Sequence, residues 1–262
     1  MQLLSSRQNP RIAELEALLT HKKNRDTALF ACEGARLCED AVQAGLTPEA
    51  VYLTEKAALR YPETASLVTG ASRAVYALDE CLAGRISDTV NPQGVFCVFK
   101  KLDNAPQAVK IVSGGKYFLL SGIQDPGNLG TIIRTAEAFG ISGVFLDSDC
   151  PDLYAPKVQR ASMGAVFRLP RESPADIRET IAVMRENGIP VYAAALTEDA
   201  IPLRGGLFRG GAAVLIGNEG AGLSRDLTGR CDAACVIPMT GGVQSLNAAM
   251  AATVFAWEMM NS

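Results

Sequence analysis

Histidine is almost absent from this chain. Its 262 residues include a single histidine, His21, which lies beside Lys22 and Lys23 in a stretch typical of an exposed helix end. A mechanism that needs a histidine base, or a metal held by histidines, has no other residue to use. The scarcity therefore disfavours Ser-His-Asp hydrolases, Cys-His proteases and histidine-ligated metal enzymes.

Long apolar runs and paired cysteines are also missing. No run of ~18 or more apolar residues occurs, and the opening MQLLSSRQNPR lacks the apolar segment of a signal peptide. We therefore expect a cytoplasmic protein without a membrane span. The seven cysteines form no C-x-x-C pair, which disfavours a disulfide framework or a zinc site. Cys231 and Cys235 are close in sequence but lack histidine partners, so we expect buried thiols and no metal.

An excess of positive charge is absent too. The formal net charge is -3, which argues against a uniformly basic nucleic-acid-binding surface. The opening arm differs from this average, because five cations stand against two glutamates between residues 7 and 25. These cations are Arg7, Arg11, Lys22, Lys23 and Arg25. They fit either a solvated helix face or a patch that contacts the phosphates of a nucleic acid.

What is present is a regular alternation of strand and helix signals. Apolar residues make up 48% of the chain and charged residues 20%, which is typical of a globular protein. Asn9 and Pro10 predict the start of a helix, because Ile12, Leu15 and Leu18 follow at helical spacing. Further signals in the front half predict strands over residues 28–34, 50–54 and 95–100 and a helix over residues 35–45.

A linker separates this half from the next. Pro106 and the glycine pair at 114–115 predict a linker over residues 106–115. We expect an α/β domain over residues 1–105 and a second domain over residues 116–262.

The second domain has the pattern of a parallel α/β sheet. Its first strand, KYFLLSGI, is a continuous apolar run that suits burial on both faces. Strands are further predicted over residues 143–147, 191–196, 212–217 and 235–239, and helices over 129–140, 155–164, 172–188 and the C-terminal residues. In such sheets ligands bind at the loops that follow the carboxyl ends of the strands.

Three of these strand-end loops have polar side chains among glycines or at a helix start. In DPGNLGTIIR, Asn128 is expected to cap the following helix, and Arg134 could pair with Glu137 one turn on. LIGNEGAGLS places Glu219 among glycines, and IPMTGGVQSLN places Ser245, the expected helix cap, just before Asn247. Neither the G-x-G-x-x-G pattern for dinucleotides nor the P-loop pattern is met. Each loop alone fits an ordinary turn, but all three follow strands of one sheet.

Together the three loops resemble the motifs of the SpoU ribose 2'-O-methyltransferases, within the SPOUT superfamily of knotted methyltransferases. The first motif is Asn128-x-Gly130-x-x-x-Arg134, the second is LIGNEGAGLS, and the third is IPM followed by SLN. The front half, through SSRQNPRIAELEALL, FACEGARLCEDAVQAG and NPQGVFCVF, is similar to the ribosomal-protein-like RNA-binding domain of that family. Gln244 departs from the family pattern, where an acidic residue is frequent, and so does NAAMAA at the start of the last helix.

The resemblance implies a fold and an activity. It implies a parallel-sheet domain with a deep trefoil knot, preceded by a smaller α/β RNA-binding domain, and a homodimer. The implied reaction transfers a methyl group from S-adenosylmethionine to a ribose 2'-hydroxyl, most plausibly in ribosomal RNA. Two alternatives stay open: a methyltransferase that acts on a base nitrogen, and a non-catalytic RNA-binding or ribosome-assembly protein with the same fold.

The resemblance also implies roles for single residues. Arg134 would contact the 2'-hydroxyl, either as the base or as an organiser of phosphate and developing alkoxide. Ser245, Asn247 and Glu219 would position the ribose, and Asn128 would orient the first loop. The cofactor pocket would be formed by Leu196, Gly217, Ile237, Met239 and Leu246. The cations of the opening arm would then contact RNA phosphates.

Overall fold

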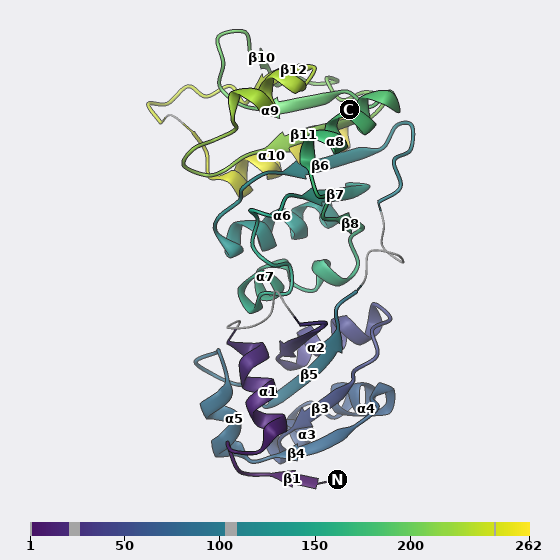
Figure 1. Ribbon diagram of the computed structural model, residues 1–262, viewed down its shortest axis with the longest axis vertical. Coiled ribbons are helices and arrows are strands. Elements are labelled where there is room, and N and C mark those ends of the chain that lie inside the picture. The colour runs from purple at the N-terminus through teal and green to yellow at the C-terminus, as the bar shows by residue number, and fades with distance from the viewer. Residues whose placement is uncertain (1, 21–26, 103–108, 244) are drawn as a thin grey trace. The chain divides into compact units, whose positions relative to one another are not determined.

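The computed structural model describes residues 2–20, 27–102, 109–243 and 245–262. The chain divides into two compact units, the first made of residues 1–102 and 152–167 and the second of residues 103–151 and 168–262. Figure 1 labels most of the elements of each unit.

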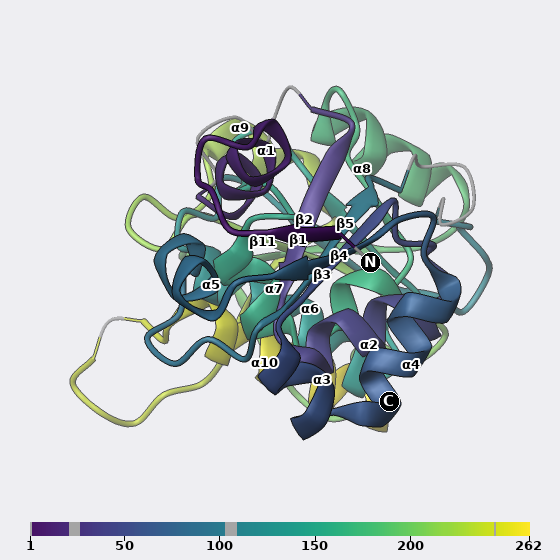
Figure 2. The same cartoon turned by 90° about the horizontal axis from the view of Figure 1, so that it is seen from below.

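The first unit contains a five-stranded mixed sheet. Its strand order is β1 (Gln2–Leu4), β4 (Val75–Leu78), β3 (Ala50–Leu53), β5 (Val95–Lys100) and β2 (Leu29–Glu33). β5 runs antiparallel to both of its neighbours, whereas β1, β4 and β3 are parallel. The helices of the front half are α1 (Pro10–Leu19), α2 (Ala35–Gln43), α3 (Glu55–Arg60), α4 (Pro62–Ala71) and α5 (Glu80–Ile86). α2 and α4 pack side by side, as Figure 2 shows.

The first helix forms where the sequence predicts it. The side chain of Asn9 accepts a hydrogen bond from the backbone N–H of Arg11, and Pro10 occupies the first helical position. Ile12 and Leu15 are fully buried in the core of this unit. The predicted strands and the predicted helix of the front half are present as well, whereas β1, β4 and α3 to α5 had no signal in the sequence analysis.

Residues 152–167 pack on the first unit. They form α7 (Pro156–Ser162) and a short 3-10 helix (Ala165–Phe167). Gln159 is buried, and its amide donates to the backbone oxygen of Ala31 on the edge strand β2 at 2.9 Å. The ring of Phe30 stacks on those of Tyr154 and Phe167, with centroids 4.3 Å and 5.9 Å away. This segment thus covers an edge that otherwise exposes unpaired backbone groups.

The position of this segment differs from the sequence-based division. That division placed residues 152–167 inside the domain of residues 116–262, whereas the contacts group them with the first unit. The sequence shows a helix there, but a helical pattern does not say which sheet its apolar face will cover.

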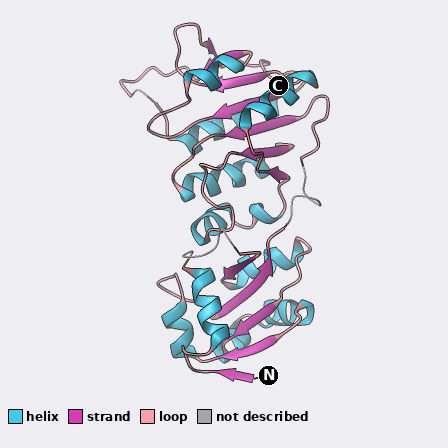
Figure 3. Ribbon diagram, viewed as in Figure 1, coloured by secondary structure: helices cyan, strands magenta, loops and turns pink. Residues whose placement is uncertain are grey.

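The second unit contains a seven-stranded sheet in which every described pair of strands is parallel. The strand order is β10 (Ile201–Pro202), β12 (Ala233–Val236), β9 (Val191–Ala194), β11 (Ala212–Ile216), β6 (Lys116–Leu120), β7 (Gly143–Leu146) and β8 (Arg171–Glu172). Its helices are α6 (Pro126–Ala138), α8 (Ile177–Glu186), α9 (Arg225–Arg230) and α10 (Ala248–Asn261). Figure 3 shows the strands of this sheet in magenta. The predicted parallel sheet is confirmed.

The central strands β6 and β11 set the position of the site. All residues of β11 are buried, as expected of a parallel strand that is covered on both faces. β12 ends at Val236, three residues before the end of the strand predicted over residues 235–239. Pro238 explains the difference, because proline has no N–H to donate to a neighbouring strand.

Candidate functional site

The carboxylate of Glu219 joins two of the three motif loops. It lies in the loop after β11 and accepts hydrogen bonds from the loop after β6. Its donors are the backbone N–H of Gln124 at 2.9 Å, the backbone N–H of Asp125 at 3.2 Å and the side-chain amide of Asn128 at 2.9 Å. Because β6 and β11 are parallel neighbours, their carboxyl ends place these loops next to each other.

The third loop joins through Asn128. The side-chain amide of Asn247 donates to Oδ1 of Asn128 at 3.0 Å. Oδ1 of Asn247 in turn accepts from the backbone N–H groups of Ala249 and Met250. In both asparagines the side-chain nitrogen donates and the side-chain oxygen accepts. The hydrogen bonds therefore form a continuous series from Asn247 through Asn128 to Glu219. The structure therefore connects Glu219, Asn128 and Asn247 through side-chain hydrogen bonds.

Two predicted helix caps are wrong. α6 is capped by Asp125, which accepts from the N–H groups of Gly127 and Asn128, because Pro126 fixes the first helical position directly after it. α10 is capped by Asn247, so the exposed Ser245 lies two residues before the cap. Since Asp125 takes over the capping of α6, the side chain of Asn128 is available to bridge the loops.

The donors around Glu219 also change its acidity. Partial burial by itself raises the pKa of the Glu219 carboxyl, but the hydrogen bonds from Asn128, Gln124 and Asp125 outweigh burial and lower the pKa. The carboxylate form is therefore the one that holds the loops together at neutral pH.

Asn218 organises the second loop and was missed in the sequence. Its Oδ1 accepts from the backbone N–H groups of Gly220 and Ala221, and its amide donates to the oxygen of Gly122 at 2.8 Å. The loop closes tightly, since a Cβ on Gly217 would lie 2.6 Å from the oxygen of Gly222. The loop itself thus requires this glycine. A signal for Asn218 was available, because asparagine in a glycine-rich turn often bonds to backbone groups just ahead of it.

A cavity of about 850 Å³ opens beside this network. All five residues predicted to bind the cofactor line it: Leu196, Gly217, Ile237, Met239 and Leu246. Glu219 and Ser245 line it as well, whereas Asn128, Arg134 and Asn247 are outside its lining. Leu196 is 77% exposed and Leu246 is 38% exposed, so apolar side chains face the open space of the cavity.

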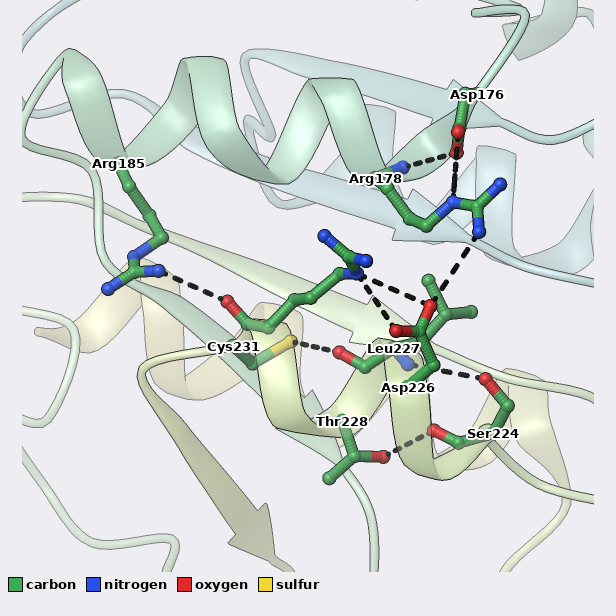
Figure 4. Close-up of polar contacts among 9 residues, drawn as sticks. Asp176, Arg178, Arg185, Ser224, Asp226, Leu227, Thr228 and Cys231 are labelled. Atoms are coloured by element: carbon green, nitrogen blue, oxygen red, sulfur yellow. Dashed lines mark hydrogen bonds and ion pairs between the residues drawn. The ribbon is translucent and has the colours of Figure 1, made fainter.

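One side of the cavity is formed by the short helix α9. None of its residues is buried, and an ion pair and a hydrogen bond join it to α8, as Figure 4 shows. Arg178 pairs with Asp176 at 2.8 Å and reaches Asp226 on α9 at 3.7 Å. Arg185 donates to the backbone oxygen of Arg230. Such exposed pairs are individually weak and are screened by salt.

Arg134 lies exposed on α6. Among the residues that the structure describes, its side chain has no hydrogen-bond or ion-pair partner. The possible pair with Glu137 is not formed, because Glu137 is held at both carboxylate oxygens by Arg168, at 2.5 Å and 2.9 Å. The guanidinium of Arg134 is therefore free to bind an anion.

The predicted RNA-binding arginines have different surroundings. Nε of Arg7 donates to Glu16 at 2.9 Å, so its charge is already neutralised within the protein. The guanidinium of Arg11 lies over the ring of Tyr76, 4.8 Å from the centroid, and has no acidic partner in the described part of the chain. Lys22, Lys23 and Arg25 lie outside the described residues.

Within the described ranges, His, Cys, Asp and Glu side chains form no group of three or more that could hold a metal ion. Over the same ranges, the helices are too short or too polar to cross a membrane.

Comparison with known proteins identifies the family. The model of the SpoU rRNA Methylase family matches residues 115–257, which is more than half of the chain. The chain belongs to the SpoU rRNA methylase family. The model of an MRM3-like substrate binding domain matches residues 9–97. The front half of this SpoU methylase therefore matches a separate domain family.

Similar proteins match this SpoU methylase over nearly its whole length. The 23S rRNA (guanosine(2553)-2'-O)-methyltransferase RlmP of Bacillus subtilis is 31% identical over 99% of each chain. The AdoMet-bound rRNA methyltransferase from Sinorhizobium meliloti is 30% identical with a TM-score of 0.85, over 98% of this chain and 97% of that one. The SpoU methyltransferase AviRb from Streptomyces viridochromogenes, in complex with AdoMet, is 27% identical with a TM-score of 0.81, over 97% of each chain. The predicted α/β fold with a separate N-terminal domain is confirmed.

The role of Glu219 in this SpoU methylase can be tested by hydrogen exchange. In the variant Glu219→Ala, the amides of Gln124 and Asp125 should exchange faster, because their acceptor is lost. Peptide-level exchange at neutral pH measures this. The matched control is Glu198→Ala, since Glu198 is exposed and has no partner among the described residues.

Acid should reproduce the effect in the wild-type protein. A carboxyl with a lowered pKa adds stability above its ordinary pKa and loses that contribution as the pH falls through the folded-state value. Protection of the two amides should therefore hold at neutral pH and fade in acid. Unchanged exchange in Glu219→Ala would contradict the proposed anchoring.

Proposed function

We propose that this chain transfers the methyl group of S-adenosylmethionine to a ribose 2'-hydroxyl of ribosomal RNA. As a SpoU methylase it is an RNA methyltransferase, and a relative that matches over 99% of its length is named as a 23S rRNA 2'-O-methyltransferase. The observation that supports the assignment most is the juxtaposition of the cavity with the network of Glu219, Asn128 and Asn247. A non-catalytic role would not need a cofactor-sized cavity beside this network.

The cavity has the chemistry that S-adenosylmethionine requires. Its volume of about 850 Å³ lies within the range of small-molecule sites, roughly 300–1,000 Å³. Ile237, Met239 and Leu246 offer apolar surface for the faces of adenine, and the backbone of Gly217 offers polar groups for its edge. Thr197, also in the lining, has the one buried side-chain oxygen that lacks a protein partner within the described residues. When bound, the cofactor supplies an electrophilic methyl group on a sulfonium.

Arg134 fits the role of an electrostatic organiser. A guanidinium keeps its protons in proteins, so we assign Arg134 to a phosphate oxygen of the RNA and to the negative charge that develops on the 2'-oxygen. A phosphate oxygen could then accept the hydroxyl proton. Ser245 and Asn247 would position the ribose, and Asn128 and Glu219 would hold Asn247 in place. Correct alignment of the reacting atoms alone can lower a barrier by several kcal/mol.

The experiment that tests this function maps ribose methylation in total RNA from cells without the gene. Wild-type protein should restore a 2'-O-methyl group in ribosomal RNA, whereas Arg134→Ala should not, because loss of such a donor lowers a rate by about 100-fold or more. The affinity of Arg134→Ala for S-adenosylhomocysteine, measured by calorimetry, should stay within about twofold of wild type, since Arg134 is outside the cavity lining.

Arg168→Ala is the matched control, because it removes a neighbouring arginine that is occupied by Glu137. It should restore methylation. If Arg134→Ala loses cofactor affinity, the assignment of Arg134 to the RNA side is wrong. If wild-type protein restores modification on a base instead, the ribose assignment is wrong.

The first unit would bind the RNA. Its match to a substrate binding domain supports this, and Arg11 is its candidate phosphate contact among the described residues of the opening arm. Arg11→Gln should weaken RNA binding. It should also lower the slope of log affinity against log salt concentration by about one, because one fewer counterion is released. Arg7→Gln should change both much less, because Glu16 already neutralises Arg7. Filter binding at several salt concentrations measures both slopes, and equal slopes in the two variants would rule out this contact.

Dimerisation would bury the exposed face of α10. Met250, Trp257 and Met260 are 51%, 56% and 44% exposed on it, and the ring of Trp257 meets Phe139 of the same chain edge-on at 6.0 Å. A contiguous apolar face of this kind usually marks an interaction site. Trp257→Glu should convert a homodimer into a monomer in sedimentation experiments, because a charge cannot be buried there unpaired. A monomeric wild-type protein would refute the proposal.

The remaining expectations are part of the same proposal. The family resemblance supports a trefoil knot formed by the C-terminal residues, which an experimental trace of residues 237–262 would test. It also supports a cytoplasmic location, which cell fractionation would test.

A further inference from the structure

Among the residues that the structure describes, four charged side chains line the cavity: Asp199, Glu219, Arg225 and Asp232. Two of them are occupied by the protein itself. Glu219 accepts from Gln124, Asp125 and Asn128. Asp232 pairs with Arg185 at 3.0 Å and accepts from the backbone N–H of Val191 at 2.8 Å. These two carboxylates therefore hold loops and strands together.

Asp199 and Arg225 are different. Both side chains are exposed, and within the described residues neither has a hydrogen bond or an ion pair, not even with the other. The other arginines of α8 and α9 are engaged, since Arg178 binds Asp176, Arg185 binds Asp232, and Arg230 binds Asp226. The cavity thus presents one free anion and one free cation.

Local structure does not explain Arg225. It is the first residue of α9, directly after the N-cap Ser224. The N-terminus of a helix carries partial positive charge, which favours an acidic residue and disfavours a cation. Asp226, the next residue, satisfies that preference. A cation at Arg225 is therefore better explained by something that it binds in the cavity.

We propose that Arg225 and Asp199 bind the amino-acid end of S-adenosylmethionine. That end is a zwitterion, with a carboxylate and an ammonium on one carbon. The planar donor fork of Arg225 suits the carboxylate, and Asp199 suits the ammonium. Ile237, Met239 and Leu246 are then left for the adenine. This inference rests on the proposed function, because it assumes that the cavity takes this cofactor.

Calorimetry with two ligands tests the assignment. S-Adenosylhomocysteine has the amino-acid end, whereas 5'-methylthioadenosine has the same adenosine and sulfur but lacks that end. Arg225→Gln and Asp199→Asn should each weaken binding of S-adenosylhomocysteine about tenfold, as expected for a lost hydrogen bond to a charged group. Both variants should bind 5'-methylthioadenosine as the wild type does.

Arg230→Gln is the matched control on the same helix, because Arg230 does not line the cavity. It should leave both affinities within about twofold of wild type. If Arg225→Gln weakens both ligands equally, its role is to shape the cavity and the proposal is wrong. If it weakens neither, the proposal is also wrong. If wild-type protein binds neither ligand, the proposed function itself fails.

Discussion

The carboxylate of Glu219 connects parts of the chain that are far apart in sequence. It reaches from the loop after β11 to donors in the loop after β6 and in the first turn of α6, and through Asn128 it reaches the cap of α10. Parallel strands make this possible, because neighbouring strands end at one edge of the sheet. Hydrogen bonds between the loops thus hold the three motif segments together, in addition to those within each segment.

Charges near the cavity fall into two groups with different physical roles. Paired groups such as Arg178 with Asp226, or Arg185 with Asp232, fix α9 and β12 around the opening. Unpaired groups, Arg134, Arg225 and Asp199, keep their binding capacity for other molecules. An unpaired exposed charge costs the folded protein little, because water solvates it, and it can exchange that water for a ligand of opposite charge.

Much of this arrangement could be predicted from the sequence. The prediction works where an element depends on neighbouring residues or on a regular repeat of apolar residues. The apolar runs of β6 and β11, the Asn9 cap of α1 and the order of the three loops were all visible. The cap of α6 was assigned to Asn128 instead of Asp125 because both residue types cap helices, and the choice depends on what else Asn128 contacts. Asn218 donates a hydrogen bond to Gly122, and Gln159 donates one to Ala31. These partners are far apart in sequence, so the spacing of residues does not predict them.

The cover that residues 152–167 give to β2 bears on how modular this enzyme is. Neither compact unit is one continuous stretch of chain, because residues 152–167 belong to the first unit and interrupt the sequence of the second. A fragment that stops near residue 105 lacks Gln159, Tyr154 and Phe167, and so leaves the edge of β2 and the ring of Phe30 bare. Exchanging the first unit of this chain for that of a relative would therefore mean transplanting two gene segments. A single crossover between residues 102 and 152 would separate residues 152–167 from the rest of the first unit.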